Sequence, residues 1–151
     1  MMEKLSNYVS YCGLYCKLCS FIALIPKQAR ALMETMRKGG WEYFGEYEFP
    51  EFKDFWKLLG KLSEFDKTVS GCRDSCGPPD CEIRRCAREH GVITCAFCPD
   101  FPCDLIREMD KKYPIIIKNL ERQKEIGLEK WIEKQEKLAQ AAHSYQEILK
   151  E

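Results

Sequence analysis

The sequence lacks several features that would point to common functions. Its 151 residues include 24 Lys and Arg and 24 Asp and Glu, so the formal net charge is zero. Without a basic field, non-specific binding to nucleic acid or to an anionic membrane is not favoured. The sequence also shows no glycine-rich nucleotide loop, no internal repeat covering the chain and no low-complexity segment. The hydrophobic fraction of 45% and the charged fraction of 32% are typical of a globular protein.

Long apolar runs are missing too. The short run Phe21–Ile25 ends at Pro26 and cannot form the core of an export signal or span a bilayer. Residues 1–7 carry Glu3 and Lys4, and no apolar stretch follows them. We therefore expect a cytoplasmic protein with no membrane contact, whose thiols face a reducing environment.

Cysteine is abundant, with ten residues in the chain. Two cysteines separated by two residues can present both thiolates to one tetrahedral ion. In a reducing compartment this pattern indicates metal more than disulfides, although a disulfide framework and unligated buried thiols are alternatives. The predicted metal ligands are Cys12, Cys16, Cys19, Cys72, Cys76, Cys81, Cys86, Cys95, Cys98 and Cys103.

The metal is predicted to be zinc, with about two ions per chain, because four thiolates per ion use eight of the ten thiols. Cys95 and Cys98 are the clearest pair, and Cys86 and Cys103 are their nearest candidate partners. An iron–sulfur cluster is the alternative, since tetrahedral thiolate sites suit both. The sequence does not fix which cysteines share an ion.

The N-terminal triplet, Cys12-x3-Cys16-x2-Cys19, has the spacing that radical enzymes use to hold a four-iron cluster. Those enzymes usually place an aromatic residue where Leu18 stands, and they need repeated strand–helix units. A zinc knuckle with its turn at Gly13 is the favoured interpretation. Such a knuckle needs at least one ligand from elsewhere, and the candidates are Cys72, Cys76 and Cys81.

Helical periodicity predicts a mainly α fold: a small helical domain with cysteine-rich metal-binding loops and at most a short β element. We expect a single domain over 1–151, comprising a cysteine-rich core over 8–113, a helical insert over about 26–65 and a helical tail over about 114–151. The expected elements are helices over about 26–38, 50–62, 80–90, 115–126 and 128–149, a helix that Pro102 opens, and a short strand over 92–94. Asp80 is the expected N-cap of the helix over 80–90, and the stretch 70–79 is expected to be turn-rich.

Apart from the cysteines, two histidines and three arginines are the candidates for metal binding or nucleic-acid binding. His90 could replace a cysteine as a ligand, but a histidine at a helix C-terminus more often complements the dipole. His143 is expected to be solvated. Arg84, Arg85 and Arg88 resemble the basic residues of finger helices. With zero net charge, a solvated face balanced by acidic neighbours is the favoured interpretation of these arginines.

The segments Tyr11–Cys19 and Cys86–Cys103 resemble a family of small cysteine-rich bacterial and archaeal proteins known as domain of unknown function 3795. Lys124–Gln135 is also similar to that family's tail. The resemblance implies a metal-binding protein and supplies no catalytic residues. Some members end in a further cysteine pair, which residues 138–151 lack.

The expected function is therefore a zinc-binding, non-enzymatic interaction module with a protein partner. No acid–base or nucleophile constellation is visible, and a closed four-cysteine site has no open position for a substrate. An iron–sulfur or thiol redox protein is one alternative. A nucleic-acid-binding, zinc-finger-like protein is another and is less favoured. The oligomeric state, including dimerisation through the tail helix, is not determined by the sequence.

Overall fold

The computed structural model describes residues 2–69, 71–74 and 76–150. Two residues of the expected turn-rich stretch 70–79, Ser70 and Ser75, lie outside this part. The described chain is helical, with one isolated antiparallel bridge between Val9 and Tyr15. The predicted mainly α fold with at most a short β element is confirmed.

The chain divides into two compact units, one formed by Ser20–Val69 and the other by Met1–Cys19 together with Ser70–Glu151. We call the first the helical unit and the second the cysteine unit, because all ten cysteines belong to the second. The helical unit contains the predicted insert, about 26–65, and extends beyond it at both ends.

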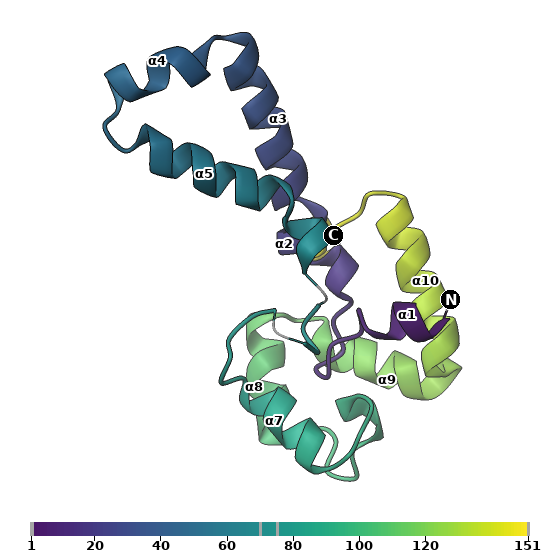
Figure 1. Ribbon diagram of the computed structural model, residues 1–151. Coiled ribbons are helices and arrows are strands. Elements are labelled where there is room, and N and C mark those ends of the chain that lie inside the picture. Colours follow the sequence, from purple (N-terminus) through teal and green to yellow (C-terminus); the bar gives the residue numbers. More distant parts are fainter. Residues whose placement is uncertain (1, 70, 75, 151) are drawn as a thin grey trace. The chain divides into compact units, whose positions relative to one another are not determined.

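The helical unit is built on two helices that lie side by side, α3 (Ile25–Lys38) and α5 (Phe52–Ser63), with α4 (Trp41–Glu48) joining their far ends (Figure 1). Its buried core is Ala29, Met33 and Leu59. Gly40 starts α4 with a φ of 77°, which glycine adopts without strain. The short helix α2 (Ser20–Ala23) precedes α3, and the short helix α6 (Phe65–Thr68) follows α5. Helix α4 was not predicted from the sequence.

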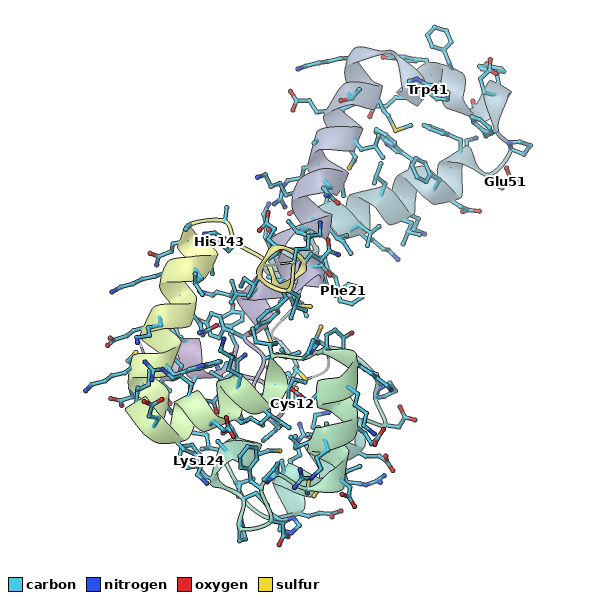
Figure 2. All side chains as sticks on the ribbon, turned by 180° about the vertical axis from the view of Figure 1, so that it is seen from behind. Cys12, Phe21, Trp41, Glu51, Lys124 and His143 are labelled. Carbon is cyan, nitrogen blue, oxygen red and sulfur yellow. The ribbon has the colours of Figure 1, made fainter. Side chains whose placement is uncertain are left out.

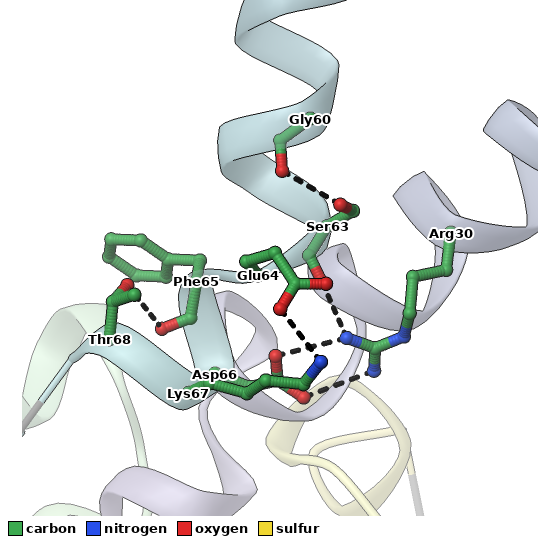
Figure 3. Close-up of polar contacts among 8 residues, drawn as sticks. All are labelled: Arg30, Gly60, Ser63, Glu64, Phe65, Asp66, Lys67 and Thr68. Carbon is green, nitrogen blue, oxygen red and sulfur yellow. Dashed lines mark hydrogen bonds and ion pairs between the residues drawn. The ribbon is translucent and has the colours of Figure 1, made fainter.

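Polar contacts fix the base of the helical unit (Figure 3). The Arg30 guanidinium donates to the Ser63 carbonyl and to both carboxylate oxygens of Asp66, the latter at 3.0 Å. The hydrogen bond from Arg30 holds the pKa of Asp66 below its usual range. Because the ion pair is largely exposed, its net contribution to stability is small.

In the part of the cysteine unit that the structure describes, eight elements are grouped around two cores. One core includes Ile106, Ile116 and Leu120, and the other joins Tyr15 and Leu18 to Trp131. The elements are α1 (Met2–Ser6), η1 (Cys16–Leu18), α7 (Glu82–Glu89), η2 (Cys95–Phe97), α8 (Asp104–Lys112), α9 (Ile116–Ile126), α10 (Leu128–Gln140) and α11 (Tyr145–Ile148), where η denotes a short 3₁₀ helix.

Three local predictions were wrong. Residues 92–94 form no strand: residues 93 and 94 are a bend, since the chain must turn there to start η2. The N-cap of α7 is Cys81 rather than Asp80. The helix expected over 128–149 is two helices: Ala142 has a φ of 60°, and the Ser144–Glu147 capping box starts α11.

The break in the tail lets its second part fold back onto the unit. Trp131 and Ile132 from α10 and Tyr145 from α11 share one buried cluster with the N-terminal Val9 and Tyr15. The tail's apolar face therefore packs within its own unit. Among the described residues, no helix combines the length and the apolarity that crossing a membrane requires.

Candidate metal centre

The two Cys-x2-Cys segments fold in the same way. In each, a 3₁₀ turn begins at the first cysteine, and the second cysteine caps the turn by donating its N–H to the carbonyl of the first. The capping cysteines, Cys19 and Cys98, have φ and ψ of −69° and 138° and of −73° and 136°. We call residues 10–19 the first knuckle and residues 94–98 the second knuckle. The equivalent backbone presents each pair of thiols in the same arrangement.

Gly13 makes the turn of the first knuckle, as expected. Its φ is 89°, and an added Cβ would lie 2.7 Å from the Cγ of buried Leu120. The turn is closed by the Ser10 side chain, which accepts from the Leu14 N–H at 2.8 Å and lies 3.1 Å from the Cys12 sulfur. The Cys95 N–H donates to the Tyr11 carbonyl at 2.8 Å, so the two knuckles are hydrogen-bonded to each other.

Helix α9 supports both knuckles, although it carries no cysteine. The Asn119 amide donates to the Gly13 carbonyl at 3.0 Å, and Leu120 packs against that turn. Four residues after Asn119, the Gln123 side chain accepts a hydrogen bond from the Thr94 hydroxyl at 2.8 Å, directly before Cys95. The i, i+4 spacing of the two amides places them on one face of α9.

The tail secures the first knuckle from another direction. The Tyr145 hydroxyl accepts from the Tyr15 N–H at 2.7 Å, immediately before Cys16. The Glu136 carboxylate accepts from the Tyr15 hydroxyl at 2.7 Å and from the Lys17 ammonium at 2.9 Å. The cysteine-free tail is thus part of the scaffold of a cysteine site.

Arg84 organises the loop that carries Cys72 and Cys76. Only 6% of its surface is exposed, and its guanidinium donates to the carbonyls of Cys72 at 2.7 Å, Cys76 at 3.2 Å and Pro78. The prediction that Arg84 lies on a solvated face was wrong. The loop folds over α7, and its carbonyls accept the hydrogen bonds that the guanidinium donates. Arg88 is exposed but donates to the Arg73 carbonyl.

Three further cysteines lie near Cys16. Burial raises the pKa of the Cys16 thiol to about 12; a 3.3 Å hydrogen bond from the Cys72 N–H opposes the rise, and nearby charge on Cys72, Cys19 and Cys76 adds to it. Burial likewise raises the pKa of Cys72 to about 11. We call Cys16, Cys19, Cys72 and Cys76 the N-terminal set.

A second group surrounds Cys95. Burial raises the pKa of its thiol to about 12, and charge on Cys12, Cys103, Cys98 and Cys86 raises it further. Cys103 is the N-cap of α8, where the helix dipole favours a thiolate. We call Cys86, Cys95, Cys98 and Cys103 the C-terminal set. These are the four cysteines that the sequence names as candidates for one site.

Cys12 and Cys81 lie between the two sets. Burial raises the pKa of Cys12, its hydrogen bond with Ser10 opposes the rise, and charge on Cys81 adds to it. The charge of Cys12 also acts on Cys72, in the N-terminal set, and on Cys95, in the C-terminal set. The two thiols left over from two four-cysteine sites are therefore next to each other.

In a tetrahedral zinc–thiolate site, neighbouring sulfurs lie about 3.8 Å apart, given Zn–S bonds of about 2.3 Å. Within the described residues, His90, Cys98 and Asp100 form the one trio whose potential ligand atoms all lie within 4.8 Å of one another. The thiols of each set are thus assembled but more widely spaced than in a closed site. The described cysteines include no disulfide.

Burial, charge repulsion and unmet hydrogen bonding all bear on whether an ion fits here. A divalent cation would offset both the burial and the mutual repulsion that raise the pKa values of these thiols. Beside the second knuckle, the Gln123 side-chain nitrogen is buried and has no hydrogen-bond partner among the described residues. The donor set is sulfur-rich, which suits zinc or an iron–sulfur cluster.

The sequence analysis missed the residues that orient these cysteines. Asn119, Gln123, Glu136 and Tyr145 were assigned to helix faces or not singled out, because single polar residues in helices give no distinctive pattern. Their roles depend on contacts with residues up to 130 positions away in the chain.

Comparison with known proteins places this architecture in a family. The family described as protein of unknown function (DUF3795) matches residues 8–108. The chain belongs to this family. The match covers both knuckles, the helical unit, α7 and the start of α8, and it ends before the similar tail segment Lys124–Gln135. No curated protein and no solved structure matches the chain.

Proposed function

We propose that this protein binds two zinc ions, one in the N-terminal set and one in the C-terminal set, and that the ions stabilise a non-enzymatic interaction module. The observation that carries the proposal is the shared backbone of the two knuckles, each of which has further cysteines nearby. Eight thiolates complete two tetrahedral sites. Cys12 and Cys81 stay outside both.

Closed thiolate sites support a structural role. Four protein ligands leave no position for a substrate or a reactive water. Zinc binding supplies folding free energy of roughly 10–16 kcal/mol in small fingers, so it can order segments with little apolar core. The stretch 71–81 contains no large apolar residue, so a bound ion would stabilise this stretch most. Thiols held in this way suit a reducing compartment, and we propose the cytoplasm.

Metal analysis tests the zinc assignment. Protein purified without added metal should carry about two zinc ions per chain, from the count of eight thiolates. Cys19→Ser and Cys98→Ser should each lose one equivalent, while the matched Cys12→Ser variant should keep both. Stoichiometric iron and sulfide would instead identify a redox protein, and full zinc occupancy in both knuckle variants would refute the assignment.

The helical unit offers the interaction surface. An apolar groove of about 390 Å³ is lined by Met36, Trp41, Phe49, Phe52 and Phe55. Trp41 and Glu51 mark it where α4 joins the neighbouring helices (Figure 2). Phe49 and Phe55 are 56% and 41% exposed although they line the groove.

The rim of this groove is acidic at Glu51, and the segment around the groove carries a net negative charge. Residues 41–54 contain five acidic residues and one basic residue, Lys53, whose ammonium pairs with Glu46 at 2.7 Å. The acidic residues are Glu42, Glu46, Glu48, Glu51 and Asp54. An apolar groove with this charge favours a basic amphipathic segment of another protein. Nucleic acid is disfavoured, since the rim repels phosphate and Arg84 is buried among carbonyls.

Two model peptides test this partner class. A fluorescent helical peptide of leucine and lysine should bind, and its leucine–glutamate counterpart should not. Phe55→Ser and Glu51→Lys should weaken binding of the lysine peptide, whereas Leu58→Ser, at an exposed position outside the groove, should not. Equal binding of both peptides, or self-association that Phe55→Ser abolishes, would refute a basic partner.

A further inference from the structure

The C-terminal set has a histidine beside it that the two-zinc count does not use. His90 caps the C-terminal end of α7, one helical turn after Cys86. Its Nδ1 lies 2.9 Å from the Cys86 carbonyl oxygen and 3.6 Å from the Cys86 sulfur. The His90, Cys98 and Asp100 ligand atoms lie within 4.8 Å of one another. Helix α7 and the segment after the second knuckle therefore bring nitrogen, sulfur and oxygen donors to one place.

The hydrogen bond to the Cys86 carbonyl sets the tautomer of the His90 ring. A carbonyl only accepts, so Nδ1 must carry the proton that it donates to Cys86. In the neutral ring the proton is then absent from Nε2, which is left with a free lone pair. Metal-binding histidines commonly use their second nitrogen in this way, which sets the tautomer and the ring orientation.

The spacing of His90 and Asp100 leaves room for an ion. Nε2 and the carboxylate oxygen are 3.9 Å apart, which makes an ion pair only with a protonated ring and is beyond hydrogen-bond distance. With a neutral ring, neither atom is hydrogen-bonded to the other. Two atoms that both bond one zinc ion at about 2.0–2.2 Å are separated by roughly 3–4 Å.

The exposed fractions of the three side chains show that the trio lies at the solvent-facing side of the C-terminal set. The side chains of Asp100 and His90 are 71% and 41% exposed, Cys98 is intermediate, and Cys95 is only 8% exposed. Cys98 belongs both to this trio and to the C-terminal set. An ion held by the trio would thus lie at the surface and already be bound to one ligand of the thiolate site.

We propose that His90 Nε2, Cys98 Sγ and the Asp100 carboxylate form an outer position for a divalent ion, through which zinc enters and leaves the C-terminal set. This inference rests on the proposed function, because it supplies an exchange route for one of the two ions. Three protein ligands leave the fourth position to water, so the outer position is labile. In the inward step, Cys86, Cys95 and Cys103 replace the histidine, the carboxylate and the water. Each thiol that becomes a ligand releases its proton to solvent, and no electron is transferred.

Exchange kinetics test the route. Isotopically labelled zinc is added to the zinc-loaded protein, and its incorporation is followed over time. His90→Gln and Asp100→Asn should each keep two zinc ions but slow the exchange of one of them by about tenfold or more, as loss of an outer metal partner commonly does. His143→Gln is the matched control, since His143 is exposed and lies in another segment. Unchanged exchange in both test variants would overturn the proposal.

A second measurement follows the histidine ring of the outer position directly. The chain has two histidines, so nitrogen-15 spectra of the rings give two separable sets of signals. Adding zinc to the purified protein should shift the Nε2 signal of His90 and leave its Nδ1–H in place, and Asp100→Asn should weaken the shift. No shift of His90, or equal shifts of His90 and His143, would overturn the outer position. A zinc content below two per chain would instead count against the proposed function.

Discussion

Replacing Arg84 with methionine should open the loop that carries Cys72 and Cys76. The variant keeps an apolar stem of similar length but removes the guanidinium, which donates to three loop carbonyls. Those carbonyls are otherwise satisfied only if the loop moves into water. The effect should therefore be local to residues 71–78 and to the N-terminal set.

The magnitude follows from the number and type of the hydrogen bonds. A hydrogen bond to a charged group contributes about 1.5–3 kcal/mol, and three that share one group are not additive. Because the variant removes the charge itself, no unpaired charge stays buried, and the total cost should be close to that of one such bond, about 1.5–3 kcal/mol. At 1.4 kcal/mol per factor of ten, zinc affinity at the N-terminal set should fall by about 10- to 150-fold.

Two assays check this expectation. Competition with a chelator gives the affinity of each zinc ion, and hydrogen exchange follows the Asp74 and Cys76 amides, which bond the Gly71 carbonyl in the folded loop. Arg85→Met is the control, since Arg85 is exposed on the same helix and lies 3.7 Å from Glu82. If Arg84→Met and Arg85→Met behave alike in both assays, the buried guanidinium does not organise the loop.

Two further predictions concern the first knuckle and its support. Gly13→Ala should destabilise the cysteine unit by about 3 kcal/mol, because a left-handed conformation costs a side chain about 1–2 kcal/mol and the new Cβ would overlap Leu120. Gly77→Ala, at a φ of 85° with no atom within 4 Å of the added carbon, should cost only the conformational part in chemical denaturation, and equal losses would contradict the packing argument. Burial alone would raise the pKa of Glu136, but hydrogen bonds from Tyr15 and Lys17 outweigh it, so the pKa is lowered. The stabilisation is therefore present above the unfolded-state pKa of about 4.3 and is lost as pH falls through the folded-state value. Glu136→Gln should be less stable than the parent by about 1–2 kcal/mol at pH 7, with the difference shrinking under acid, and a difference independent of pH would refute this account.

Some of the structure was predictable because it depends on near neighbours in the chain. The helices α3, α5 and α9 were expected close to their observed bounds, since periodic apolar residues and glycine or proline at the ends are local signals. The Cys-x2-Cys turns and the role of Gly13 are local as well. The break at Ala142 was missed, because alanine in the left-handed region leaves no signal of its own; the capping box of Ser144 and Glu147 is the local signal for the helix that follows.

The sequence by itself determined that this is a mainly α, cysteine-rich chain of the DUF3795 family with two short-spaced cysteine pairs. Only the tertiary structure decided which cysteines lie near Cys16 and Cys19, and that Arg84 is buried in the loop. It also decided that Asn119, Gln123 and Tyr145 orient the knuckles. The physical reason is that spacing within a few residues is set by backbone geometry, whereas these contacts form only when distant segments pack and leave polar groups that must find partners.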